Sequence, residues 1–278
     1  MKNSCDCHAH VCGPESRYPY AANRLYTPDD ALPSDYRRML DSLGIERGVL
    51  VQPSIYATDN RALLDALAQD PARLRGVAVV PWDISSKELE RLHAAGVRGV
   101  RQNIVDLKDG KGVLPLAELK ALARKIKPFG WHVEFLMHVD EFPDLDRQLA
   151  DFPVEVVFGH LGYVPTRKSA EEPGFKALLR LMKDGKAWVK MTAPYRLTSG
   201  GMPYADTDKF ARSLVAAAPE RLLWGTDWPH VMFAAAMLDD AKLFGLFERW
   251  VPDEKARRRI LVDNPAQLYD FPPIQSAM

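Results

Sequence analysis

The run Asp6-Cys7-His8-Ala9-His10, close to the start of the chain, combines residue types and a spacing that could do chemistry. Alternate side chains of a β-strand point to the same face, so the run predicts that Asp6, His8 and His10 share one face and that the cysteines point the other way. Two imidazoles on one face can bind a metal ion or polarise one oxygen together. An ordinary core strand would carry valine or isoleucine there, because buried polar groups without partners are costly. The other interpretation is a pair of exposed or hydrogen-bonded histidines without a chemical role.

The composition is that of a globular protein with a large core. The 278 residues are 47% hydrophobic and 27% charged, a length that suits one large domain or two small ones. Lys+Arg and Asp+Glu both number 37, so the formal net charge is +0. This balance gives no reason to expect nucleic acid or an anionic membrane as a partner, although a local basic cluster could bind a small anionic substrate.

Several features favour a cytoplasmic protein. No apolar run is long enough to span a bilayer, and the first residues contain no hydrophobic signal segment. The three cysteines, Cys5, Cys7 and Cys12, are an odd number at one end, which argues against a disulfide framework. A zinc site of the paired-cysteine type would need a second pair, so we expect the cysteines to be small buried residues. Oligomeric state stays open.

Short apolar runs recur along the chain with amphipathic, helix-like segments between them. Eight runs are candidate strands, short and valine-rich enough to be buried on both faces: Cys5–Val11, Gly48–Gln52, Gly76–Val80, Val97–Gln102, Trp131–Leu136, Val154–Phe158, Ala187–Met191 and Leu222–Gly225. The segments between them predict helices over Ser34–Leu43, Asn60–Ala68, Ser86–Ala95, Pro115–Lys127, Pro143–Ala150, Phe175–Lys183 and Asp206–Ala217. A further helical tail begins at Phe233 and is interrupted at Pro252.

This alternation predicts an α/β fold, a single-domain (β/α)8 TIM barrel over residues 1–278, because eight such units in this length match that fold. A doubly wound open sheet is the other possibility, but no glycine-rich phosphate loop follows the first strand. The segment Gly13–Pro33, rich in tyrosine and proline, is expected to form a long loop over the barrel mouth.

Chemistry in such a barrel gathers at the carboxyl ends of the strands. Asp227 follows the eighth strand directly, and His160 follows the sixth, so both are candidates to join His8 and His10. Asp227 could instead cap a helix, and His160 could be a hydrogen-bonded core residue. Arg101 lies near the end of the fourth strand, where a charged side chain needs a partner or a ligand. Arg98 has the opposite parity and should face away.

Five phrases and three motifs together resemble the amidohydrolase superfamily. The motifs are DCHAH, VVFGHLG and LLWGTDWPH, and the phrases are DCHAHVCGP, RLYTPDDA, VQPSIYATDN, GVRGVRQN and WVKMTAPYRL. They are specific in combination, they cover essentially the whole chain, and they resemble most closely the branch that contains 2-pyrone-4,6-dicarboxylate lactonase. That resemblance implies a (β/α)8 barrel and hydrolysis of a small carboxylated lactone, 2-pyrone-4,6-dicarboxylate being the best candidate, in the breakdown of aromatic compounds.

The resemblance also implies roles for individual residues. Asp227 would be the general base that activates water, while His8, His10 and His160 would polarise the carbonyl. The substrate would be held by a second set of side chains, namely Tyr26, Ser54, Arg101 and Arg196. Where the lactonases carry a further arginine, this chain has Lys108, which would supply a point charge in its place.

The metal requirement divides the superfamily. Metal-dependent members usually add a histidine at the end of the fifth strand, but here His132 lies early in that strand and His138 lies past its end. We therefore expect no metal cofactor, as in the lactonase branch. The other possibility is a divalent ion such as zinc held by His8, His10, His160 and Asp227.

Other function classes remain open from the sequence. A sugar-acid lactonase or lactone isomerase of the same branch would rely more on hydroxyl and amide partners, such as Ser54, Tyr56 and Asn103. A metal-dependent decarboxylase on the same barrel would need stoichiometric metal. A barrel that only binds a ligand is disfavoured, because a binder has no need of a placed base such as Asp227.

Overall fold

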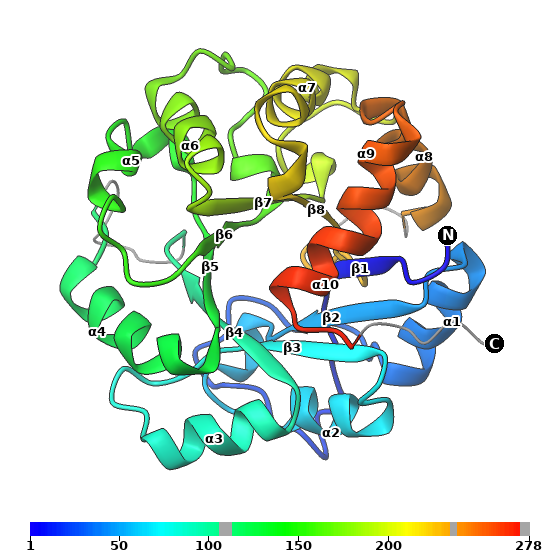
Figure 1. The fold of residues 1–278 in the computed structure, drawn as a ribbon. Helices are drawn as coiled ribbons and strands as arrows, with labels where there is room; N and C mark the ends of the chain where they lie inside the picture. The colour runs from blue at the N-terminus through cyan, green and yellow to red at the C-terminus, as the bar shows by residue number, and fades with distance from the viewer. Residues whose placement is uncertain (106–112, 234–237, 273–278) are drawn as a thin grey trace.

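Eight short parallel strands form one sheet that curls into a barrel. In the computed structural model, which describes residues 1–105, 113–233 and 238–272, the strands are hydrogen-bonded in sequence order from β1 to β8. Helices surround them on the outside (Figure 1). The predicted (β/α)8 barrel is confirmed, and the doubly wound open sheet is wrong. The strands are β1 (Cys5–Ala9), β2 (Arg47–Val51), β3 (Leu74–Ala78), β4 (Val97–Asn103), β5 (His132–Leu136), β6 (Val156–Phe158), β7 (Ala187–Met191) and β8 (Leu222–Trp224).

The helices also lie where the apolar periodicity predicts them. The outer ring contains α1 (Pro33–Leu43), α2 (Arg61–Gln69), α3 (Ser86–Ala94), α4 (Leu116–Ile126), α5 (Leu145–Gln148), α6 (Pro173–Lys183), α7 (Asp208–Ala217) and α8 (Asp240–Trp250). The tail continues with α9 (Glu254–Arg258) and α10 (Asn264–Leu268). Pro252 separates α8 from α9, as expected, because proline cannot donate a helix hydrogen bond. The predicted start of the tail at Phe233 is wrong, because Phe233 is not helical and α8 begins only at Asp240. α5 is four residues shorter than its predicted segment.

The core has two parts. The larger part lies between the strands and the surrounding helices; on α6, for example, Phe175, Leu178 and Leu181 are buried at helical spacing. The smaller part fills the lower interior of the barrel and is closed by the end of the chain. It contains alternate residues of the strands together with the tail: Cys5, Cys7, Val49, Val51, Val77, Val157, Trp188, Leu223, Leu268, Tyr269 and Phe271. The three cysteines are buried and free, as expected.

The barrel is closed between β1 and β8 by a buried carboxylate. Asp6 accepts hydrogen bonds from the Thr226 amide (3.0 Å) and hydroxyl (2.6 Å), from the His8 amide (3.0 Å) and from Tyr36 of α1 (3.1 Å). Main-chain bonds complete the junction, since the His10 amide donates to Trp228 and the Asp227 amide donates to His8, each at 2.8 Å. The junction therefore holds the end of β1 against the segment that follows β8.

This junction corrects the prediction that Asp6 shares a face with His8 and His10. Asp6 points outward to Tyr36, while Cys7 belongs to the barrel interior and His8 also turns inward. The pairing of β1 with β2 explains the change. Asp6 pairs with Gly48 and Ala9 pairs with Leu50, so β1 advances by three residues where β2 advances by two. Such a bulge breaks the strict alternation of a strand, and it leaves consecutive side chains on the inner side.

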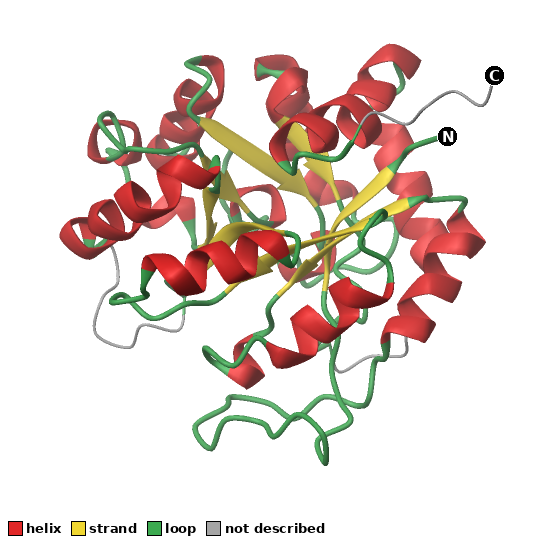
Figure 2. Ribbon diagram, turned by 60° about the horizontal axis from the view of Figure 1, so that its bottom comes forward, coloured by secondary structure: helices red, strands yellow, loops and turns green. Residues whose placement is uncertain are grey.

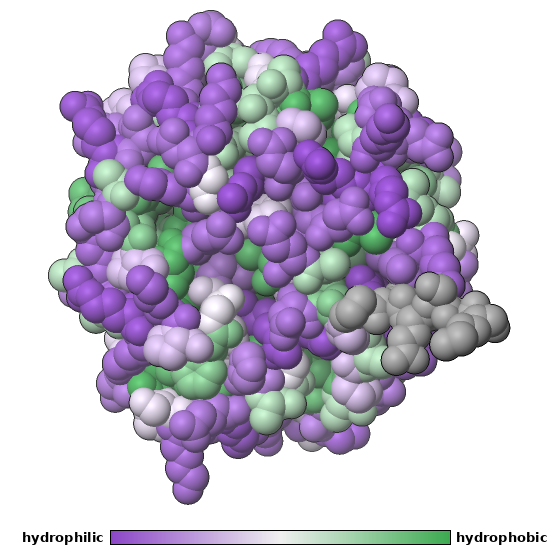
Figure 3. Space-filling model, in the orientation of Figure 1, coloured by the Kyte–Doolittle hydropathy of each residue, from purple (hydrophilic) through white to green (hydrophobic). Residues whose placement is uncertain are grey.

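The long loop after β1 lies at the end of the barrel opposite α10 and the N-terminus (Figures 1 and 2). A bridge between Cys12 and Ala31 joins the two ends of this loop, and Tyr26 from the loop lines the cavity described below. The prediction for Gly13–Pro33 is confirmed. The opposite face, with α10 and the chain ends, is mainly hydrophilic (Figure 3). Across the described ranges, the helices are all too short or too polar to cross a membrane.

We predict that Asp6→Ala destabilises the protein by about 2–4 kcal/mol, because it leaves buried donors of Thr226, His8 and Tyr36 without an acceptor. Urea unfolding at neutral pH measures this loss. Asp41→Ala is the control, since that carboxylate on α1 is exposed, and its loss should change the free energy of unfolding by less than about 0.5 kcal/mol. Equal effects of the two substitutions would contradict the role of Asp6 in closing the barrel.

Candidate active site

Four side chains predicted to act together meet in the barrel mouth. His8, His10, His160 and Asp227 are all buried. Asp227 Oδ1 lies 3.4 Å from His8 Nε2 and 3.7 Å from His10 Nε2. The ring centroid of His8 is 5.0 Å from that of His10 and 5.2 Å from that of His160. Residues from three separate parts of the chain therefore form one cluster, as the strand-end argument predicts.

The backbone at the strand ends is strained where it presents these groups. His160 has a φ of 51° and Asp227 a φ of 66°, both in the left-handed region that residues with a Cβ rarely adopt. Asp227 stays in this conformation because its own amide is bonded to His8 and its carbonyl accepts from the His230 amide at 2.7 Å. Strain of this kind is typical of positions where a side chain must point in a particular direction.

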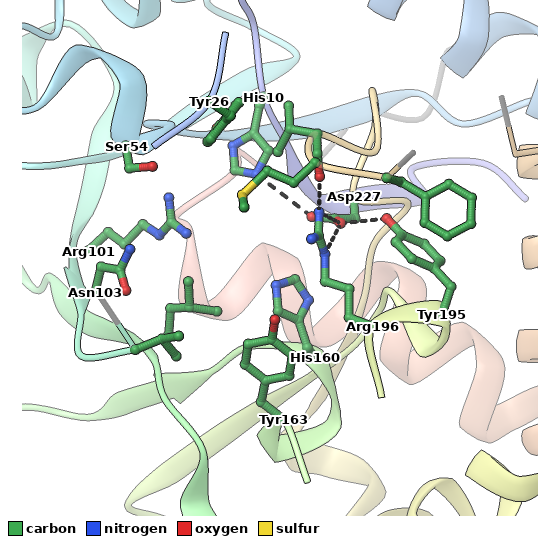
Figure 4. A pocket seen from close by; sticks show the side chains of 15 residues that line it. His10, Tyr26, Ser54, Arg101, Asn103, His160, Tyr163, Tyr195, Arg196 and Asp227 are labelled. Carbon is green, nitrogen blue, oxygen red and sulfur yellow. Dashed lines mark hydrogen bonds and ion pairs between the residues drawn. The ribbon is translucent and has the colours of Figure 1, made fainter. Parts of the chain in front are cut away.

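The two oxygens of Asp227 have different surroundings. Oδ2 accepts from the Tyr195 hydroxyl at 2.6 Å and from Arg196 Nε at 2.8 Å, whereas Oδ1 has no hydrogen-bond partner in the described part of the chain (Figure 4). Burial by itself would raise the pKa of this carboxyl, but the Arg196 guanidinium beside it holds the pKa well below its ordinary value. Asp227 is therefore an anion with one oxygen available.

Two of the imidazoles are neutral at physiological pH. Burial, followed by the charge of Lys190, lowers the pKa of His8 to about 4. Burial also holds the pKa of His160 well below its ordinary value. His10 is fixed differently, because its Nδ1 lies 2.7 Å from the carbonyl oxygen of Val51. That oxygen can only accept, so Nδ1 carries a hydrogen and, in the neutral ring, Nε2 is an acceptor.

Behind His8 lies a buried ion pair to which the sequence analysis assigns no role. Lys190 Nζ lies 2.6 Å from Glu134 Oε2 and 3.1 Å from His8 Nδ1, and both charged side chains are almost completely buried. Burial by itself would raise the pKa of Glu134, but the charge of Lys190 outweighs it and keeps that pKa below the ordinary range. Strand alternation could have indicated that both side chains point into the barrel. Glu134 lies two residues after His132 and Lys190 lies two residues after Trp188, and His132 and Trp188 are both in the barrel interior.

The residues expected to hold a substrate line one cavity of about 340 Å³ above this cluster. Tyr26, Ser54, Arg101 and Arg196 all line it, together with Asn103 and Tyr163 (Figure 4). Arg101 and Arg196 lie on opposite sides, with His10 and His160 between them. Arg101 is anchored on the carbonyl oxygen of Gln52 at 2.9 Å. Lys108 lies outside the described residues.

The prediction that Arg101 and Arg98 of β4 point to opposite faces is confirmed. Arg98 does not reach the cavity; it bonds to the carbonyl oxygen of His93 and lies 3.3 Å from Asp270. The two histidines near β5 also stay out of the catalytic cluster. His132 lies in the barrel interior against the ring of Tyr269, and His138 Nδ1 bonds to the carbonyl oxygen of Tyr163.

The cluster has donors that fit a divalent metal ion. One ligand atom each from His8, His10 and Asp227 lies within 4.8 Å of the other two, and His160 is outside that group. Ligands about 2.0–2.1 Å from a tetrahedral zinc ion are about 3.3–3.4 Å apart, close to the two distances at Asp227 Oδ1. His8 Nε2 and Asp227 Oδ1 are also buried, and neither has a hydrogen-bond partner among the residues that the structure describes. These three residues would therefore hold a metal, if one binds.

Comparisons with known proteins agree with this geometry. Residues 5–271 match the family model described as amidohydrolase. The chain is 37% identical over 273 residues to a 2-pyrone-4,6-dicarboxylate hydrolase of Comamonas testosteroni, which covers 95% of this chain and 89% of that protein. It is 35% identical to a 4-sulfomuconolactone hydrolase of Hydrogenophaga intermedia (96% and 88% covered) and 35% identical to a D-galactarolactone isomerase of Agrobacterium fabrum (93% and 89% covered).

A solved structure is similar over the whole chain. It is a crystal structure of a probable 2-pyrone-4,6-dicarboxylic acid hydrolase from Acinetobacter baumannii with citric acid bound. The TM-score is 0.85 with 30% sequence identity, and the match covers 97% of this chain and 100% of that one.

The contact between Tyr195 and Asp227 predicts a pH-dependent stability difference. Tyr195→Phe removes one donor from Oδ2, so we expect the pKa of Asp227 to rise and the free energy of unfolding at pH 7 to fall by about 1–2 kcal/mol. A depressed carboxyl pKa contributes stability above the unfolded pKa near 4 and loses it as the pH falls through the folded value. The difference between wild type and variant should therefore shrink below about pH 4.

Denaturant unfolding at pH 7 and at acid pH measures this difference. Tyr204→Phe is a matched control, because Tyr204 packs against the Tyr195 ring but does not bond to Asp227. A Tyr195→Phe effect that is independent of pH would show that the hydroxyl does not act through the charge of Asp227.

Proposed function

The chain belongs to the amidohydrolase family, and on that premise we propose that it hydrolyses a small lactone bearing carboxylates, with 2-pyrone-4,6-dicarboxylate as the best candidate. The observation that carries the proposal is the pair of arginines, Arg101 and Arg196, on opposite sides of a cavity that Asp227, His10 and His160 also line. An arginine fork suits a carboxylate because it can bind both oxygens. Arg196 already donates from Nε to Asp227 and from Nη2 to the Val231 carbonyl oxygen, so a substrate carboxylate would meet its Nη1. Two cationic groups on opposite sides match a planar ring with two carboxylates.

Asp227 activates the water in this proposal. Its free Oδ1 accepts a proton while the water oxygen forms a bond to the lactone carbonyl carbon. His10 Nε2, an acceptor beside Oδ1, takes the second hydrogen bond of the same water and orients it. A carboxylate of low pKa is a weak base, so the water must be held in place and attack an already polarised carbonyl.

The carbonyl oxygen is polarised by the neutral imidazoles of His8 and His160, which donate to the oxyanion as it forms. The tetrahedral intermediate then collapses. The bond from the carbonyl carbon to the ring oxygen breaks, and the proton held by Asp227 is transferred to that oxygen. Water is consumed, a carboxylic acid and a hydroxyl group are formed, and Asp227 is regenerated as the carboxylate.

We propose that this reaction needs no metal. A metal bound to His8, His10 and Asp227 would polarise the carbonyl and lower the pKa of water. Two cations already lie at those ligands, since Lys190 contacts His8 and Arg196 contacts Asp227. Each cation is balanced by one carboxylate, so a dication would add uncompensated positive charge to a buried site. This argument supports metal-independent hydrolysis.

A lactone of a sugar acid is the second candidate. Hydroxyl and amide groups of Tyr26, Ser54, Asn103 and Tyr163 also line the cavity and could bind a polyol. The similarity to D-galactarolactone isomerase is the comparison that favours this substrate class. A panel of lactones distinguishes the two candidates.

The direct test is turnover of 2-pyrone-4,6-dicarboxylate, which is monitored through the loss of ultraviolet absorbance as the ring opens. The panel adds a sulfonated muconolactone and sugar-acid lactones. We expect hydrolysis of the pyrone to persist after treatment with a chelator. The metal content of the same sample is measured to verify that the metal has been removed. Asp227→Asn should reduce kcat by about 10²–10⁴-fold with little change in substrate affinity, because it preserves shape but removes the base. Absence of pyrone turnover would contradict the proposed substrate. Turnover only with stoichiometric zinc would contradict the metal-independent reaction.

Arg101→Met is the cleaner test of carboxylate recognition, because Arg196 also holds Asp227. We expect KM to rise about 10–100-fold with a smaller change in kcat, since a charge-assisted pair is lost. Arg98→Met is the matched control from the same strand, and it should leave KM unchanged because Arg98 points away from the cavity. An unchanged KM in Arg101→Met would argue against the dicarboxylate substrate.

A further inference from the structure

The Lys190–Glu134 pair is the most deeply buried charge pair in the described part of the chain, and the proposed reaction does not use it. Lys190 is 0% exposed and Glu134 is 2% exposed. A buried ion pair costs more to desolvate than a surface pair and is weak evidence for stability, so its presence directly behind His8 calls for a reason. The contact with His8 Nδ1 supplies one.

We propose that Lys190 is a positioning residue that holds His8 in the tautomer with its hydrogen on Nε2, so that His8 is a hydrogen-bond donor and not a metal ligand. The inference rests on the proposed function only for its catalytic consequence. The tautomer itself follows from contacts at both ends of the ring.

At the inner end, a lysine ammonium has three donors and no acceptor. His8 Nδ1, 3.1 Å from Lys190 Nζ, must therefore supply a lone pair. Glu134 Oε1 is 3.2 Å from the same nitrogen and would favour the other tautomer, but this contact is an ion-pair distance without hydrogen-bond geometry. Glu134 instead accepts from Lys190 at 2.6 Å and holds the ammonium in place.

At the outer end, His8 Nε2 faces Asp227 Oδ1 at 3.4 Å, a contact that also lacks hydrogen-bond geometry and acts through charge alone. An ionised carboxylate oxygen only accepts, so a lone pair on Nε2 would repel it and an N–H would attract it. Both ends of the ring favour the same hydrogen position. A ring that accepts from Lys190 at Nδ1 carries its single hydrogen on Nε2.

The two histidines of the motif therefore have opposite roles. His10 donates from Nδ1 to the Val51 carbonyl oxygen and offers a lone pair on Nε2, while His8 accepts at Nδ1 and offers a hydrogen on Nε2. A lactone carbonyl needs a donor and an attacking water needs an acceptor, so this asymmetry suits hydrolysis. A metal would need lone pairs on both Nε2 atoms, and His8 can provide one only after losing the bond from Lys190.

The test uses the full-length protein labelled with ¹⁵N-histidine and long-range ¹H–¹⁵N spectra, which distinguish the two tautomers without any substrate. Signals of His8 are assigned by their loss in His8→Asn. We expect the Nε2–H form for His8 and the Nδ1–H form for His10. Glu134→Gln retains the lysine donor and should keep the Nε2–H form. The double variant Glu134→Gln with Lys190→Met buries no unpaired charge. Because it lacks the lysine donor at Nδ1, His8 should lose its preference for the Nε2–H form.

Two further measurements follow from the same variants. Zinc titration by calorimetry should give a Kd at least tenfold lower for the double variant than for wild type, because Nε2 becomes available as a ligand. With lactone substrate and no metal, kcat of the double variant should fall at least tenfold while KM changes less than about threefold. Thermal unfolding of each variant verifies that the barrel is intact.

His8 in the Nδ1–H form in the wild type, or an unchanged tautomer and zinc affinity in the double variant, would overturn the proposal. Failure of the lactonase function is distinguishable from this, because the spectra and the zinc titration need no turnover. A wild type with Nε2–H on His8 and no lactone hydrolysis would leave the positioning role standing and refute only the proposed substrate class.

Discussion

The junction between the first and last strands is the constraint on which the site depends. A barrel closes only if β1 meets the end of β8, and here the Asp6 carboxylate and two main-chain bonds make that connection. The same bonds bring His8 and His10 within 4 Å of Asp227. Closing the fold and assembling the site are therefore one event, and a polar residue in the core is stable there because its bonds are satisfied.

Charge is the second organising feature of the molecule. Two buried ion pairs, Asp227 with Arg196 and Glu134 with Lys190, lie in or beneath the mouth of the barrel. Each pair places a cation against one of the polar groups of the cluster, Arg196 against Asp227 and Lys190 against His8. The low dielectric of the site strengthens these interactions, and this orients side chains before a substrate arrives. Catalytic power in such a site comes from preorganised donors and acceptors.

Much of this arrangement could be predicted from the sequence. The eight apolar runs located the strands to within about two residues, because strands buried on both faces must be continuously apolar. Once the barrel was recognised, strand order placed His160 and Asp227 at the same rim as the first motif. Parity distinguished Arg101 from Arg98. Parity failed at Asp6, because a bulge in β1 cannot be read from residue types.

Periodicity and position at strand ends were enough to predict the fold class, the cluster of His8, His10, His160 and Asp227, and the inward direction of Arg101, while Arg196 came from the resemblance to a known family. The folded structure was needed to show which atoms of these residues are bonded and which face the cavity. The free oxygen of Asp227, the acceptor nitrogen of His10 and the ion pair behind His8 all arise from contacts between strands far apart in the chain. Hydrogen-bond direction depends on the partner that each atom meets, and a sequence does not specify those partners.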